Sequence, residues 1–112
     1  MNDPFDLDGL RMNAVETAPN GAINADTIFR FEQTGARVHA EYAGGRGELG
    51  HLVGLVRGAT FAFRYCQLHD DGTLHGGQSN CELRRADDGR LQIIEHFEWD
   101  DGPGTNVIQE LR

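Results

Sequence analysis

One acidic residue interrupts an otherwise apolar series near the C-terminal end of this 112-residue chain. Along the stretch LQIIEHFEW, every second residue reads Leu91, Ile93, Glu95, Phe97 and Trp99, and a period of two is typical of a β-strand with one face in a core. Burying an unpaired carboxylate costs several kcal/mol, so a buried acid is protonated, hydrogen-bonded or matched by a ligand. Glu95 is therefore the residue best suited to anchor a ligand.

Several residues that can donate a hydrogen bond are expected on the same inward face as this acid. Together with two phenylalanines they predict a polar-lined pocket among aromatic rings, which is typical of a small-molecule site inside a barrel. The candidate ligand-binding residues are Glu95, Tyr65, Tyr42, Ser79, Trp99, Phe63, Phe97 and Gln109. The alternative is a hydrogen-bonded network that is satisfied within the protein and serves only to fix the register of the strands.

No other set of residues has the spacing of a catalytic or metal site. The histidines are scattered, and His39, His51 and His96 are expected on the outer face of different strands. Cys66 and Cys81 are expected roughly 17 Å apart, too far for a disulfide, because a strand rises ~3.4 Å per residue. The sequence thus predicts free thiols, no metal, no cofactor and no catalytic group.

Two Asp-Asp-Gly turns, Asp70–Gly72 and Asp87–Gly89, set the register of the second half of the chain. A three-residue loop ending in Gly suits a type I turn followed by a glycine bulge, because Gly enters the left-handed region without a steric cost. His69 should then lie opposite Thr73, and side chains that alternate with a period of two share one face. The rows expected across the inward face are Phe63–Ser79–Phe97 and Tyr65–Gly77–Trp99.

The first half of the chain predicts further antiparallel strands. Thr34-Gly35 reads as a two-residue hairpin loop, which would place Phe31 opposite Val38 and Phe29 opposite Ala40. The next strand would turn one set of residues inward: Gly50, Leu52, Gly54 and Val56. Its glycines would then lie opposite Tyr65 and Phe61.

These elements predict an all-β fold of about eight sequential antiparallel strands. Strands outside the region 59–99 are expected over residues 10–17, 27–33, 36–43, 48–56 and 105–111. An up-and-down meander of this kind closes most naturally into a small barrel of calycin- or streptavidin-like architecture, because closure removes exposed strand edges. The alternative is a β-sandwich, although sandwiches usually need longer crossovers. Residues 1–112 should form one domain, with 1–9 as a loose lead-in in which Phe5 and Leu7 could cover one end of the core.

Strand 48–56 is apolar on both faces. Its outer set is Leu49, Val53 and Leu55, so either the register slips by one residue at Arg57-Gly58 or an apolar patch faces outward. Such a patch on a charged protein often marks an interface. With Leu68 beside it, the patch predicts a homo-oligomer.

The charge balance limits the classes of partner. Ten basic and 18 acidic residues give a net charge of −8, which opposes binding to nucleic acids and to anionic membrane surfaces. No apolar run reaches the length of a membrane span, and the N-terminus lacks the pattern of a signal peptide. A cytoplasmic location is therefore expected.

Three segments carry a resemblance to a known family: Phe63-Arg64-Tyr65-Cys66-Gln67, the Ser-x-x-Glu of Ser79 to Glu82, and the aromatic-rich Glu-x-x-x-Trp of Glu95 to Trp99. From about Asn20 onward the chain resembles a group of small uncharacterised bacterial proteins commonly labelled "N-acetylglutamate synthase". It departs from them at Phe97, where Trp is usual, and at Gln109, where Glu is usual. The acetyltransferase activity that the label implies is disfavoured, because no glycine-rich strand-to-helix turn is present to hold the pyrophosphate of acetyl-CoA.

Three functions remain open, in decreasing order of support. The first is a barrel that binds a small organic molecule, with Glu95 and Tyr65 as polar anchors. The second is a structural or interaction module with a filled barrel and a working outer face. An enzyme comes last, because no catalytic constellation emerges.

Overall fold

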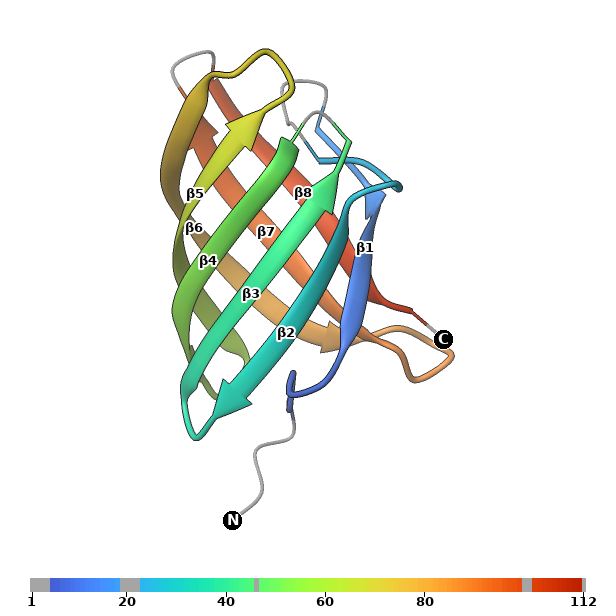
Figure 1. Cartoon of the computed structure of the whole chain (residues 1–112). Coiled ribbons are helices and arrows are strands. Elements are labelled where there is room, and N and C mark those ends of the chain that lie inside the picture. The colour runs from blue at the N-terminus through green and yellow to red at the C-terminus, as the bar shows by residue number, and fades with distance from the viewer. Residues whose placement is uncertain (1–4, 19–22, 46, 100–101, 112) are drawn as a thin grey trace.

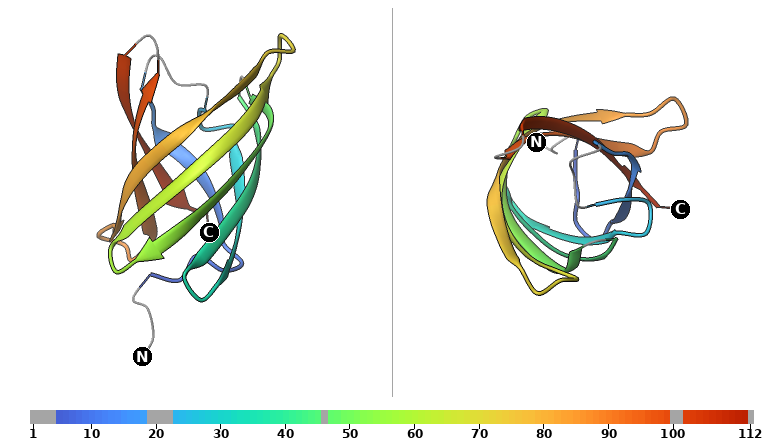
Figure 2. Two further views of the ribbon diagram at one scale, coloured as in Figure 1. Left: turned by 90° about the vertical axis from the view of Figure 1, so that its left-hand side faces the viewer. Right: turned by 90° about the horizontal axis from the view of Figure 1, so that it is seen from above.

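Eight antiparallel strands close into a single barrel (Figures 1 and 2). The computed structural model describes residues 5–18, 23–45, 47–99 and 102–111. The strands are β1 (Arg11–Glu16), β2 (Ile28–Thr34), β3 (Arg37–Gly44), β4 (Gly47–Arg57), β5 (Thr60–His69), β6 (Leu74–Arg85), β7 (Leu91–Trp99) and β8 (Gly102–Glu110). Each pairs with the next, and β8 pairs with β1. The barrel prediction is confirmed, and the sandwich alternative is wrong.

The Asp-Asp-Gly turns have the expected geometry. Gly72 and Gly89 both have positive φ, at 84° and 88°. The amide of His69 donates to the carbonyl of Thr73 at 2.9 Å, so these residues flank the first loop as expected. In consequence the predicted row Phe63–Ser79–Phe97 is confirmed from β5 to β7. Of the second row, Tyr65 lies opposite Gly77 as predicted, and the place of Trp99 in it stays a prediction.

The hairpin between β2 and β3 differs from the prediction. Its two-residue loop is Gly35-Ala36, not Thr34-Gly35, and Phe29 lies opposite Tyr42. The reason is the backbone of Gly35, whose φ of 61° suits the first loop position of a type II′ turn. The pairing moves by two residues, so the inward-facing set is unchanged.

The strand with two apolar faces, β4, keeps one register with β5 from Leu49 to Arg57, after a shift between Gly47 and Leu49. The four residues predicted to face inward do so, and Leu52 and Val56 are almost fully buried. The predicted partners of its glycines, Tyr65 and Phe61, are wrong, since Gly50 pairs with Gln67 and Gly54 with Phe63. No slip occurs at Arg57, which pairs with Thr60 across a second Gly-Ala turn. The outer apolar residues therefore face away from the lumen.

The lumen has an apolar half and a polar half. The apolar half lies toward the lower end in Figure 1, the end at which the N-terminal segment lies. Its buried side chains are Met12, Phe31, Val38, Val56, Phe61, Leu83, Leu91, Ile93 and Ile108. Leu7 belongs to this cluster and is fully buried, and its amide donates to Oε1 of Gln33 at 2.9 Å. The expectation that Leu7 helps to cover one end of the core is thus confirmed.

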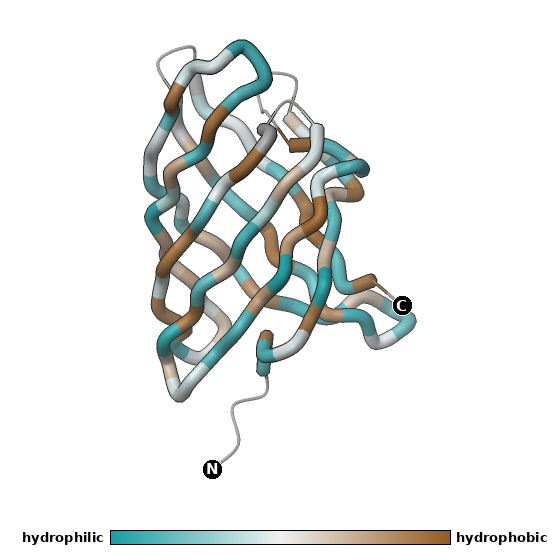
Figure 3. Tube along the Cα trace, in the orientation of Figure 1, coloured by the Kyte–Doolittle hydropathy of each residue, from teal (hydrophilic) through white to brown (hydrophobic). Residues whose placement is uncertain are grey.

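The outer wall is mainly polar, and Figure 3 shows hydrophilic and hydrophobic residues alternating along the strands. Val15 on β1 is exposed, and a group of exposed apolar residues lies on β4: Leu49, Val53 and Leu55. Leu68 is half-buried beside them, and Leu74 on β6 is 72% exposed. An apolar patch therefore does face outward.

Candidate ligand site in the polar half of the lumen

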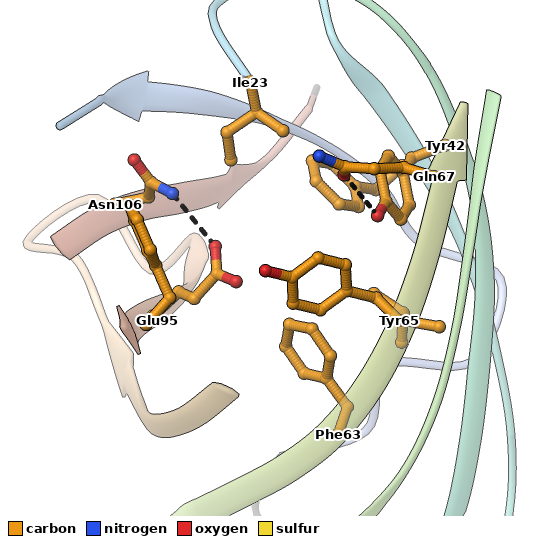
Figure 4. A pocket seen from close by; sticks show the side chains of 10 residues that line it. Ile23, Tyr42, Phe63, Tyr65, Gln67, Glu95 and Asn106 are labelled. Atoms are coloured by element: carbon orange, nitrogen blue, oxygen red, sulfur yellow. Dashed lines mark hydrogen bonds between the residues drawn. The ribbon is translucent and has the colours of Figure 1, made fainter. Parts of the chain in front are cut away.

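A small cavity lies in the polar half of the barrel, between the β3–β5 wall and the β7–β8 wall (Figure 4). It is lined by Ile23, Phe29, Tyr42, Leu52, Phe63, Tyr65, Gln67, Glu95, Phe97 and Asn106. The free space at its centre is about 20 Å³. This is enough for one water molecule, which needs roughly 10–15 Å³ by this measure.

Glu95 is the acidic group of the cavity, and it is buried as predicted. The hydroxyl of Ser79 donates to Oε2 of Glu95 at 2.7 Å, and Nδ2 of Asn106 donates to Oε1 at 3.1 Å. Asn106 sits directly opposite Glu95 on β8. Its amide is oriented by the backbone N–H of Ala18, which donates to Oδ1 at 2.9 Å. The carboxyl group is thus held by donors from both neighbouring strands.

A second polar pair lies on the facing wall. The hydroxyl of Tyr42 donates to Oε1 of Gln67 at 2.8 Å, and Nε2 of Gln67 lies 2.9 Å from Nε2 of His69. The ring of Tyr42 stacks on Phe29 with centroids 4.7 Å apart. It also occupies the space left by Gly50, where a Cβ atom would come within 2.2 Å of the ring. Packing on both sides therefore fixes the hydroxyl toward the cavity.

Tyr65 extends from β5 across the lumen between the two walls. Figure 4 shows its hydroxyl directed toward Glu95. The ring packs edge-on against Phe63 at 6.0 Å and lies over Gly77, where a Cβ atom would be 2.8 Å from the hydroxyl oxygen. This side chain is therefore one of those that limit the free space of the cavity to about 20 Å³.

Burial dominates the electrostatics of the site. It raises the pKa of Glu95 above its usual range, and the hydrogen bonds from Ser79 and Asn106 and the charge of His96 lower it only in part. Burial also raises the pKa of Tyr42, and the nearby Glu95 adds to that effect. Each described arginine lies on the outer wall or in a turn. No described arginine therefore faces Glu95, and the buried His69 is hydrogen-bonded to Gln67 on the opposite wall.

A comparison with protein families assigns this barrel. A family model described as "Avidin-like protein" matches residues 5–111, nearly the whole chain. The chain belongs to the avidin-like family. Searches of curated proteins and of solved structures gave no significant match.

Most of the predicted site residues meet in the lumen of the avidin-like barrel. Tyr42, Phe63, Tyr65, Glu95 and Phe97 line the cavity. Ser79 is buried and bonded to the acid, as expected for a donor. Tyr42, another candidate donor, lines the cavity but donates its hydroxyl to Gln67 and not to Glu95.

Two predicted residues do not contribute to the described cavity. Gln109 accepts a hydrogen bond from Nε2 of Gln92 at 2.6 Å, and the two residues pair on the outer side of β7 and β8. Its expected place in the lumen is wrong. It belongs instead to the face opposite that of Asn106, since neighbouring inward positions differ by two residues. The side chain of Trp99 lies outside the described part of the structure.

Gln67 and Asn106 line the cavity but were not among the predicted site residues. Gln67 continues the inward series Phe61, Phe63 and Tyr65 of the avidin-like barrel, so a polar residue in that series was the available signal. Asn106 could be found only from the pairing of β7 with β8. That register depends on the last hairpin, for which the sequence predicted a strand starting at Thr105 rather than at Gly102.

The described residues offer little for a metal site or a disulfide. Within the described ranges, no group of three His, Cys, Asp or Glu residues could hold a metal ion. Both cysteines are free thiols, Cys66 exposed and Cys81 buried, as predicted. The described residues include no helix that could span a membrane.

Proposed function

We propose that this avidin-like protein binds a small organic molecule in the polar half of its lumen. The supporting observation is that two polar groups from opposite walls, Glu95 with Asn106 and Tyr42 with Gln67, face one cavity among aromatic rings (Figure 4). Buried, convergent polar groups on an apolar wall are what orient a ligand in such sites. Avidin-like barrels typically bind small molecules, biotin among them.

Ligand entry requires Tyr65 to move. The free space of about 20 Å³ does not admit an organic molecule, and Tyr65 is the half-buried side chain that spans the lumen. Rotation of this side chain about χ1 would enlarge the cavity without changing the strands. Tyr65 would then be a polar anchor at the edge of the ligand.

Native mass spectrometry of freshly purified protein tests this function. We expect a non-covalent adduct that is lost from the variant Asn106→Leu, which removes one of the two polar walls. The control is Arg64→Gln, a change on the outer face of the strand that carries Tyr65. A second arm measures thermal stabilisation by biotin and by a panel of small amines, alcohols and carboxylic acids, because a ligand that binds only the folded state raises its stability. Absence of both an adduct and any stabilisation would refute the function.

A filled barrel that acts through its outer face is the second candidate. It is favoured by the small cavity and by the exposed patch of Leu49, Val53 and Leu55, of which Val53 is 68% exposed. We propose that this patch, with Leu68, joins copies of the chain into a homo-oligomer. Sedimentation velocity at micromolar concentration should show an oligomer that Val53→Lys dissociates. A monomer at all concentrations would exclude it.

The label of the similar bacterial proteins adds no activity to this proposal. An acetyltransferase would need a helix N-terminus for the pyrophosphate of acetyl-CoA, and the described residues form strands and turns only. The resemblance of the chain to those bacterial proteins stays a prediction. The two free thiols support a reducing, cytoplasmic location, which we also propose.

A further inference from the structure

We propose that Glu95 binds the ammonium group of a small organic amine and releases its own proton when the amine binds. This inference rests on the proposed function and names the chemical class of the ligand. It follows from the hydrogen bonds of the acid, from the charges that face it, and from the aromatic walls.

The hydrogen bonds leave one place for a proton on Glu95. Because Asn106 accepts from Ala18 through Oδ1, its Nδ2 must donate to Oε1 of Glu95. The partner of Oε2 is the hydroxyl of Ser79, which can either donate or accept. In the protonated form of the acid the proton sits on Oε2 and is donated to Ser79, the reverse of the hydrogen bond in the structure, where the hydroxyl of Ser79 is the donor. Once the acid is ionised, the hydroxyl of Ser79 turns and donates instead.

No described arginine faces Glu95, and the buried His69 is hydrogen-bonded to Gln67 on the opposite wall. Cys81 lies opposite on β6, Tyr42 faces it from β3 and Tyr65 from β5, and each of these is neutral or negative. His96 is next to it on β7 but points to the outer wall, where it lies 3.8 Å from Glu82. Burial favours the protonated acid in these surroundings. A bound cation is what would favour the carboxylate.

The aromatic rings around the acid select the same kind of ligand. Phe63, Tyr65 and Phe97 line the cavity beside Glu95, and the negative faces of aromatic rings attract an ammonium group. An anion would gain no attraction from the rings, would oppose ionisation of the acid, and would be disfavoured by the net charge of −8. The ammonium group would take the water-sized space at the centre, and the carbon chain would take the space that Tyr65 leaves when its side chain rotates.

Isothermal titration of the intact protein tests this inference with three probes of one shape: benzylammonium, benzyl alcohol and benzoate. Methylammonium serves as a smaller cation. We expect benzylammonium to bind at least about tenfold more tightly than benzyl alcohol, because a charge-assisted hydrogen bond is stronger than a neutral one. Titration in phosphate and in HEPES should show release of up to one proton per bound cation. The affinity should rise with pH, by up to about tenfold per unit.

Two variants serve as matched controls. Glu95→Gln keeps a group that can donate to Ser79 and accept from Asn106, so it should fold but lose at least about tenfold in affinity for benzylammonium and all proton release. Glu41→Gln makes the same chemical replacement at an exposed position on the outer wall of β3 and should bind as the original protein does.

Several results would overturn the inference. One is that benzylammonium and benzyl alcohol bind equally well, and another is that binding releases no proton and does not depend on pH. The inference would also fail if Glu95→Gln bound benzylammonium as the original protein does, or if neither ammonium probe bound at millimolar concentration. A neutral or anionic adduct, such as biotin, found by native mass spectrometry would support a ligand site in the lumen while refuting the amine.

Discussion

Replacing Glu95 by Gln should stabilise the ligand-free protein at neutral pH. The glutamine has nearly the shape of a protonated glutamic acid, so its oxygen can accept from Asn106 and its amide can donate to Ser79. What the substitution removes is the ability to ionise. Its effect on stability therefore isolates the cost of keeping an acid at this buried position.

The size of the effect follows from proton linkage. An unfolded glutamate has a pKa of about 4.3, and burial raises that of Glu95 in the folded state. Between these two values the unfolded chain has lost a proton that the folded chain keeps, so the free energy of unfolding falls as pH rises. The slope is about 1.4 kcal/mol per pH unit, and it ends above the folded pKa. The contribution of the protonated Glu95 to the free energy of unfolding is therefore fully present below a pH of about 4.3 and is lost as the pH rises through the folded pKa.

Urea denaturation of both proteins between about pH 5.5 and 8.5 measures this slope. The range stays above the sequence pI of about 4.9, where low net charge promotes aggregation. The stability difference between Glu95→Gln and the original protein should grow with pH and then level off, whereas Glu41→Gln should give no such trend. A difference that stays constant with pH, or that shrinks as pH rises, would refute the argument that this acid is protonated in the folded barrel.

Three further changes test the packing of the barrel. Leu7→Ala should lower the free energy of unfolding, measured by urea denaturation, by about 2–5 kcal/mol, because the Leu7 side chain is fully buried at the lower end of the barrel. A decrease of less than about 1 kcal/mol would show that Leu7 does not close the core. Gly50→Ala should cost about 1–3 kcal/mol, since its Cβ would displace the ring of Tyr42; full stability would contradict this packing. Ellman's reagent should label Cys66 alone in the native protein, because Cys81 is buried and burial raises the pKa of its thiol; rapid labelling of both would contradict the assigned faces.

The faces of the strands could be predicted because they depend on local rules. The Asp-Asp-Gly turns fix the register from β5 to β7, and alternation then assigns each side chain inward or outward. These two rules place Glu95 inside the barrel and Arg64 outside it, even when the way in which the sheet closes is not known. The wrong loop predicted at Thr34-Gly35 did not change which side chains of β2 and β3 face inward, since a pairing error of two residues preserves the face.

The partners within the lumen could not be predicted in this way. Which residues meet across a barrel depends on closure of the sheet and on the height of each side chain along the axis. Tyr42 and Gln67 bond to each other although they come from β3 and β5, which are not adjacent. The error at Gln109 has another origin, because its face depends on where the last strand begins. The alternation of inward and outward residues along a single strand carries no information about this non-local geometry.

The polar half of the lumen distinguishes a ligand site from a structural network. If Ser79 and Asn106 needed only a partner that fixes the register, glutamine would serve both, and an apolar residue of similar size would remove the cost of a buried acid. The chain carries an ionisable group at this position, surrounded by rings and without a cation. A pH-dependent gain of stability in Glu95→Gln would therefore show that the acid costs free energy in the empty barrel, as expected where charge serves a bound molecule. Loss of stability at every pH would favour the network, because it would mean that the carboxyl group holds its neighbours better than an amide can.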